Sequence, residues 1–315
     1  MKNISYPISL IQILLIVLTI SSCEKFTEGV IQEIPFPEHT PRLTATLIVN
    51  DEDEKIFAHI SSSASVLDSE GPQSVEGAVI TLTDESGQTL YALTESDFYN
   101  FNYILNLEDS FGTTLGMTTL TVDAPGFDQI TATNSMPSKP IFDLNYEYQG
   151  DSTYYLGGFH FQDVYTLDFE NNLGVDKNYL IHIDARYIEN GTGDTLEWES
   201  MRLNTRPDPR ITTISTQPRS SGIIVTDESS SSSSAALSDI QVLTKSFPEG
   251  SKWSPISKRV RVESLSPELA QFYLSVDAHS SGGPDFFAEP SLIYSNISSG
   301  FGCFGLASEV VILVE

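Results

Sequence analysis

The sequence is poor in cysteine, with Cys23 and Cys303 as its two cysteines. If Cys23 is modified, as argued below, no disulfide can form within the chain. Cys303 lies between Phe301 and Phe304, a context that predicts a small buried apolar residue. A nucleophilic cysteine would need a base and an orienting group, and the neighbouring residues signal neither.

Basic residues are also scarce, because 16 lysines and arginines stand against 43 acidic residues, for a formal charge of −27. A surface this acidic repels nucleic acids and anionic lipid headgroups, so we expect neither as a ligand. Acidity of this kind favours solubility and does not by itself identify a partner.

Leu10 to Ile20 is the apolar segment that comes nearest to a membrane span, but it is too short to cross a bilayer. With Lys2 before it, this run is typical of a signal peptide. Ile20-Ser21-Ser22-Cys23 follows at once and resembles a bacterial lipobox, in which small residues precede a cysteine that becomes acylated. The alternative is an ordinary cleaved signal with an incidental cysteine.

The lipobox interpretation predicts a lipoprotein signal peptide at 1–22, lipidation of Cys23 and a tether at 23–37. Several acyl chains on one cysteine would hold the protein on a membrane essentially permanently. We therefore expect an outer-membrane protein that is lipid-anchored. Glu24, Lys25 and Glu28 fit either exposure at the cell surface or a position on the periplasmic face.

Motifs for catalysis and for cofactors are also lacking, since no G-x-S-x-G, H-E-x-x-H or P-loop pattern is found. The hexapeptide GFGCFG, from Gly300 to Gly305, does fit the dinucleotide fingerprint G-x-G-x-x-G. That fingerprint needs a following helix and a returning strand, and "LASEVVILVE" is too short for both and reads as a strand. We expect no cofactor and no enzymatic activity, and interpret the glycines as turn residues of a terminal β-hairpin.

The sequence is rich in patterns that predict short β-strands. From Pro41 to Asn134 apolar residues alternate with polar ones between turn signals such as "ESG" and "PGF". This spacing predicts an Ig-like β-sandwich domain over 38–137. The prolines of "MPSKPIFD" then indicate a linker.

The rest of the chain, 138–315, has longer strands with alternating aromatic residues, which predict a larger antiparallel β sandwich or barrel-like domain. The six consecutive serines in "DESSSSSSAALSD" predict a surface loop. One amphipathic helix is expected near 266–277, because Ser266 and Pro267 form a start signal and Leu269, Phe272, Tyr273 and Val276 follow at helical spacing.

Three groups of residues are candidate binding sites. His182 and Asp184 share a strand face and His160 lies on the preceding strand, so together they are candidates for a metal; the simpler interpretation is a polar, solvent-exposed strand face. The turn Asn50–Glu54 carries clustered oxygens but lacks the glycine and ligand spacing of a calcium loop, which favours a solvated acidic turn. We predict no metal site. Surplus aromatic residues in "FYNFNY", "YEYQGDSTYYLGGFHF" and "PDFFAEP" suit either a core or a surface that binds sugars or proteins.

Across nearly the whole chain after the signal, the sequence resembles the Bacteroidota lipoproteins grouped as domain of unknown function 4249. The resemblance is carried by "CEK", "RLTATLIVNDEDEKIFAHISSSASV", the helix "SPELAQFYLSV" and the closing "EPSLIYSNISSGFGCFGLASEVVILV". The family has no assigned catalytic residues, and its genes often neighbour those of TonB-dependent receptors. The resemblance thus implies an accessory or binding component beside such a receptor. A surface glycan- or solute-binding lipoprotein is the alternative, and a hydrolase is the least favoured class.

Overall fold

The structure, a computed structural model, describes part of the chain beyond the tether. The described residues are 38–65, 68–97, 101–112, 116–153, 160–170, 177–214, 222–226, 237–245, 252–281 and 292–314. For 149–153, 160–162, 245 and 281 the backbone alone is described. The predicted signal peptide, Cys23 and the serine run therefore lie outside the described residues.

Short alternating segments form the strands of the first half, as the sequence predicts. In β1 and β2 every second side chain is buried along most of the strand, which is the pattern of a sheet with one packed face. The seven strands are β1 (Leu43–Asn50), β2 (Lys55–Ser62), β3 (Val79–Thr83), β4 (Thr89–Glu95), β5 (Tyr103–Asn106), β6 (Met117–Asp123) and β7 (Ile130–Ser135).

Longer strands follow in the second half, together with one helix, α3 (Pro267–Ser281). The strands are β8 (Phe142–Thr153), β9 (His160–Phe169), β10 (Asn178–Glu189), β11 (Glu199–Ser200), β12 (Leu203–Thr205), β13 (Ile211–Ile214), β14 (Gly222–Thr226), β15 (Ile240–Lys245), β16 (Trp253–Leu265) and β17 (Phe301–Val314).

These strands form two sheets. A 13-stranded sheet runs in the order β13-β14-β10-β16-β17-β1-β2-β5-β4-β3-β6-β7, with β11 pairing to β10 off this path, and a second sheet has the order β12-β15-β9-β8. The all-β class is confirmed. The larger sheet is mixed, because β1 and β17 pair in parallel, so the expectation of purely antiparallel strands is wrong at this pair.

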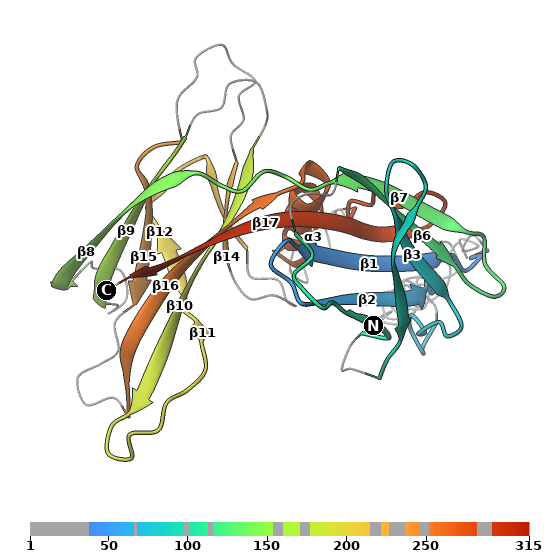
Figure 1. Ribbon diagram of the computed structural model, residues 1–315. Helices are drawn as coiled ribbons and strands as arrows, with labels where there is room; N and C mark the ends of the chain where they lie inside the picture. The colour runs from blue at the N-terminus through green and yellow to red at the C-terminus, as the bar shows by residue number, and fades with distance from the viewer. Residues whose placement is uncertain are drawn as a thin grey trace, which may run out of the picture. The chain divides into compact units, whose positions relative to one another are not determined.

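Strand β17 joins the two halves of the large sheet. Its first part pairs with β1, from Thr44 opposite Phe301 to Asn50 opposite Ala307, and its second part pairs with β16 (Figure 1). The last strand of the chain thus lies between β1 and β16. The division into domains at 38–137 and 138–315 stays a prediction, and β17 contributes side chains to cores on both sides of it.

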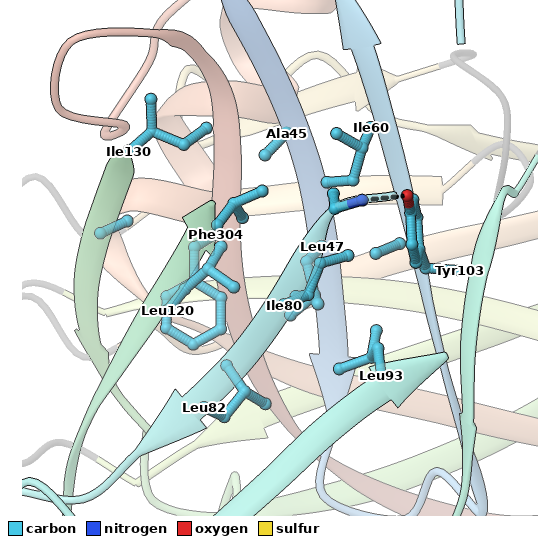
Figure 2. Packing of buried hydrophobic residues seen from close by; sticks show 14 of the residues in the cluster. Ala45, Leu47, Ile60, Ile80, Leu82, Leu93, Tyr103, Leu120, Ile130 and Phe304 are labelled. Carbon is cyan, nitrogen blue, oxygen red and sulfur yellow. Dashed lines mark hydrogen bonds between the residues drawn. The ribbon is translucent and has the colours of Figure 1, made fainter. Parts of the chain in front are cut away.

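One core fills the N-terminal strands. Figure 2 shows Phe304 of β17 among side chains from β1, β2, β3, β4, β6 and β7 of this cluster. Tyr103 is fully buried at its margin, where its hydroxyl accepts a hydrogen bond from the backbone N–H of Ala78 at 2.9 Å and donates to Val75 O at 3.0 Å. Burying a tyrosine is favourable here because its polar atom keeps two partners.

Two further cores lie on opposite faces of the β10–β16 region. The larger one contains Ile181, Ile183, Val260 and Val262 together with Tyr165 and Leu167 of β9, so it joins the two sheets. The smaller one lies under α3 and contains Leu180, Leu265, Leu269, Cys303 and Ala307, among others. Alternation along β10 and β16 produces both faces, since successive side chains of a strand point in opposite directions.

The helix begins where the sequence predicts and ends four residues later than expected, at Ser281 instead of 277. The Ser266 hydroxyl accepts a hydrogen bond from the N–H of Leu269 at 3.4 Å, and Ser266 O accepts from Ala270 N, which is the geometry of a helix N-cap. The late residues of α3 are still good enough helix formers to continue, because none is glycine or proline.

The glycines of GFGCFG are not hairpin turn residues, and that prediction is wrong. Gly302 and Gly305 lie within β17, and Gly300 immediately precedes it. A Cβ on Gly302 would lie 2.0 Å from Ala45 O, one on Gly305 2.6 Å from Leu269 Cδ1, and Gly302 has φ +111°. The glycines therefore allow β17 to approach β1 and helix α3 closely.

Candidate functional site

A row of charged side chains lies on the face of β10, β16 and β17 opposite the core that joins the two sheets. The strand register sets His182 opposite Arg261, Asp184 opposite Arg259, and Glu263 opposite Glu309. We call this set the charged face: His182, Asp184, Arg259, Arg261, Glu263 and Glu309. Every second residue in "KRVRVE" belongs to it, so the alternation in the sequence already signals a polar face there.

Asp184 is the best-connected carboxylate of the charged face. Its side chain is 3% exposed, and its Oδ2 lies 2.8 Å from Arg259 Nε and 3.6 Å from Arg261 Nη1. Its Oδ1 accepts a hydrogen bond from Ser200 Oγ at 2.9 Å. Each of the three partners donates to this buried carboxylate or carries positive charge, so its oxygens are paired within the protein.

Arg261 connects three strands through its guanidinium. Its Nε lies 2.6 Å from Glu309 Oε1 and its Nη2 3.1 Å from Glu263 Oε1. Burial alone would lower the pKa of Arg261, but the two carboxylates raise it above its usual value. Burial raises the pKa of Glu309, and Arg261 offsets part of that rise. The acids and bases of this face therefore largely neutralise one another.

The rim of the charged face carries an aromatic ring and a third arginine. The Arg259 guanidinium carbon lies 4.6 Å from the centre of the Trp198 ring, within the range of a cation–π interaction. Arg186 donates from Nε to Leu196 O at 3.3 Å. The segment that carries Trp198 is thereby held against β10 and β16.

A pocket opens beside this face. It has a volume of about 640 Å³ and is lined by Ser200, Arg202, Leu203, Asn204, Thr205, Thr213, Ile214 and Gly222. Gly222 also lies against His182, because a Cβ built on it would be 2.9 Å from His182 Cε1. Ser200 connects the pocket to Asp184, so the pocket and the charged face form one continuous polar region. Sequence reasoning missed this pocket, since its residues come from separate short strands.

A second polar cluster is buried between the two sheets. Lys258 Nζ lies 2.6 Å from Asp163 Oδ2, and Asp163 also accepts hydrogen bonds from Tyr146 at 2.7 Å and Thr244 at 3.3 Å. Burial, followed by the hydrogen bond to Asp163, raises the pKa of the Tyr146 hydroxyl far above its usual value. The cluster joins β9 to β16 and was not predicted from the sequence. Its groups bind one another, and this arrangement suits a structural role.

The metal candidates are only partly described. His182 and Asp184 are both buried on the same face of β10, as the sequence predicts, but Asp184 binds arginines and a serine. His160 begins β9, which belongs to the other sheet, and its side chain is outside the described residues. Within the described ranges, no group of three or more His, Cys, Asp or Glu side chains is placed to hold a metal ion.

The acidic turn at Asn50–Glu54 is less solvated than the sequence suggests. Asp51 is 1% exposed, and its Oδ2 lies 3.3 Å from Lys139 Nζ while its Oδ1 accepts the N–H of Glu309 at 2.8 Å. The Lys139 ammonium thus supplies the positive charge that a bound calcium ion would otherwise bring to this turn. The turn connects β1, β17 and the segment after β7, and this structural use could not be seen from local sequence.

The residues of the aromatic segments differ in their burial. Phe101 packs against Phe57 with ring centres 5.2 Å apart, Tyr103 is in the core, and Tyr148 is 61% exposed. Residues 98–100 and the segment "PDFFAEP" lie outside the described residues, as do the side chains of 149–162. Tyr148 is therefore an exposed aromatic of the kind that could bind a ligand, and the other described rings of these segments serve mainly for packing.

Cys303 is fully buried under α3, as predicted from its aromatic neighbours. Burial raises the pKa of its thiol to about 12, which leaves it protonated and unreactive near neutral pH. Among the described residues, no helix is both long and apolar enough to cross a bilayer. The predicted lipidation at Cys23 lies outside the described residues and stays a prediction.

Comparison with known families identifies the family of this chain. Residues 31–312 match the family described as "Domain of unknown function (DUF4249)". The chain belongs to this family. The match confirms the resemblance to this family and covers all three cores, the charged face and the pocket of this DUF4249 protein. A search of curated proteins finds no match.

Proposed function

We propose that the protein is a lipid-anchored, non-enzymatic binding protein of the outer membrane that acts beside a TonB-dependent receptor. The observation that carries the binding role is the pocket beside the charged face, with polar groups on an apolar floor. Sites of this composition suit recognition of a ligand by hydrogen bonds and one charge. The lipobox at Cys23 supports the anchor, and the family resemblance supports the receptor as partner.

The charged face favours binding over catalysis. Its buried acids already have partners, since Asp184 pairs with Arg259 and Ser200, and Glu309 pairs with Arg261. A general acid or base works best with a pKa near the working pH and a direct path to substrate. A neutralised network of this kind instead fixes the position of the strands around the pocket.

The anchor and the partner are tested together in native envelopes. A tagged protein is purified under mild detergent, alongside a Cys23→Ala variant that cannot be acylated. We expect the unaltered protein to fractionate with membranes and to co-isolate a TonB-dependent barrel in near-stoichiometric amount, and the variant to lose both properties. If the Cys23→Ala variant still fractionates with membranes after a carbonate wash, the lipid anchor at Cys23 is contradicted. If the unaltered protein is isolated without any barrel, the proposed receptor partner is contradicted.

A second function, the binding of a surface glycan or other solute without a barrel partner, is favoured by the pocket and by exposed Tyr148. An exposed ring can stack on the apolar face of a sugar. Recovery of the lipoprotein alone, with measurable affinity for an oligosaccharide, would support this function over the first.

A further inference from the structure

The pocket beside the charged face has the size and construction of a small-ligand site. Its volume of about 640 Å³ lies in the range of sites that enclose small organic molecules. Leu203, Ile214 and Gly222 are buried and form an apolar floor, whereas Ser200, Arg202 and Thr213 are exposed at the rim. An apolar floor with a few polar groups fixes both the position and the orientation of a ligand.

Arg202 gives this pocket a charge that the described protein does not neutralise. No ion pair joins Arg202 to a carboxylate in the described part of the chain, whereas Arg210 pairs with Asp208, and Arg259 and Arg261 pair on the charged face. Carboxylates are abundant, since the chain carries 43 acidic against 16 basic residues, and yet none of the described ones pairs with Arg202. An arginine in a pocket without a carboxylate partner is suited to bind an anion from solution.

The chemistry of the rim narrows the class of anion. One guanidinium offers two parallel N–H donors, which match a single carboxylate. A phosphate group is usually held by several cations or by the backbone N–H groups of a helix N-terminus, and the pocket lining has neither. Thr205, Thr213 and the amide of Asn204 add groups that can donate to and accept from hydroxyls, and Ser200, whose proton goes to Asp184, can accept.

The rim is held in place before any ligand arrives. The Ser200 hydroxyl donates to Asp184, and strand β11, which carries Ser200, pairs with β10. Asp184 is in turn fixed by Arg259. A prearranged rim lowers the entropy lost on binding, which favours a specific site over an incidental hollow.

We infer that this pocket binds a small hydroxylated carboxylate, such as an acidic monosaccharide, through Arg202 and the surrounding hydroxyl and amide groups. The inference rests on the proposed binding function and names the class of ligand. It concerns the isolated protein alone, so its test is independent of the membrane anchor and of the barrel partner.

Calorimetric titration of the protein from residue 24 onward tests the inference, with glucuronate, galacturonate and gluconate as probes and neutral glucose as the comparison. We expect at least one acid to bind with a dissociation constant below about 10 mM and glucose to bind more weakly, since only the acids can pair with a guanidinium. Arg202→Gln should weaken acid binding about tenfold or more, because a charge-assisted hydrogen bond is lost.

Arg206→Gln is the matched control, because Arg206 is also an exposed arginine but does not line the pocket. It should leave affinity unchanged. Thr213→Val, which removes a rim hydroxyl with little change in volume, should weaken binding several-fold, and circular dichroism confirms that each variant is folded. Absence of binding by all three acids, equal binding of glucose, or equal effects of the two arginine variants would overturn the inference. Co-isolation of a barrel would be unaffected by any of these results.

Discussion

Gly305 provides a sharp test of how β17 and α3 fit together. It lies in β17 opposite Ile48, and a Cβ added there would be 2.6 Å from Leu269 Cδ1, 3.0 Å from its Cβ and 3.1 Å from its Cγ. Leu269 is fully buried in the first turn of α3, so it cannot swing out to solvent. Gly305→Ala should therefore force β17 and α3 apart.

The size of the effect follows from overpacking. An extra methyl group in a close-packed core costs about 1–3 kcal/mol of stability. Alanine loses less conformational entropy on folding than glycine does, which offsets about 0.5 kcal/mol of that cost. Leu269→Ala alone should cost about 2–5 kcal/mol through the cavity it leaves. In the double variant the contacts to Cγ and Cδ1 are gone and the 3.0 Å contact to Cβ remains, so the further cost of Gly305→Ala should fall to about 1 kcal/mol.

Urea unfolding of the four proteins, followed by the fluorescence of Trp198 and Trp253, measures the coupling between the two sites. Gly116→Ala is the control glycine, because its added Cβ would meet the end of the flexible Glu85 side chain at 3.1 Å and should change stability by less than about 0.5 kcal/mol. If Gly305→Ala costs as much without the leucine side chain as with it, the close approach to α3 is not the reason for this glycine.

Two further variants and a labelling experiment test the polar contacts and the thiol. Asp163→Asn leaves the half-buried Lys258 without its carboxylate and should cost up to about 3–5 kcal/mol in urea unfolding, whereas wild-type stability would contradict this ion pair. Burial that raises the pKa of Cys303 to about 12 should keep it unreactive to a thiol reagent at pH 8 until the protein unfolds, so rapid labelling of the native protein would refute its burial. The hydrogen bond to Glu52 raises the pKa of Lys139 in the folded protein. The contribution of Lys139 to stability is therefore complete below the unfolded-state pKa and is lost as the pH rises through the higher folded-state pKa. The stability difference between wild type and Lys139→Met should shrink above about pH 10.5, and a difference that stays constant would contradict the pairing of Lys139 with the acidic turn.

Local signals in the sequence predicted most elements of the fold. Alternation of apolar and polar residues located strands such as β1 and β2, and the Ser266-Pro267 start signal located the helix. These features depend on neighbouring residues, so a single sequence contains them. The charged alternation around Arg259 and Arg261 could likewise be read as a polar face.

Long-range pairing could not be predicted in the same way. The parallel contact of β1 with β17 joins Leu47 to Phe304, and nothing in either segment specifies the other. The glycines of β17 were misread for this reason, because the strand and helix that they approach are far away in sequence. Asp163 and Lys258 have polar side chains that suggest a solvated face, yet they meet between the sheets and satisfy each other.

The same long-range pairing decides where the candidate site lies. Strand β17 connects β1 to β16, β16 pairs with β10, and β10 holds β11 with Ser200 at the pocket. Each step is a hydrogen-bonded ladder, so the pocket is built on rigid strands and its rim is tied to buried Asp184. Gly305 packs under α3 and is not among the pocket residues, so a change there tests the fold without altering the groups that would touch a ligand. If Gly305→Ala lowers stability while the affinity for an acid that depends on Arg202 is kept, the stability of the sheet and the chemistry of the pocket are separable properties of this fold.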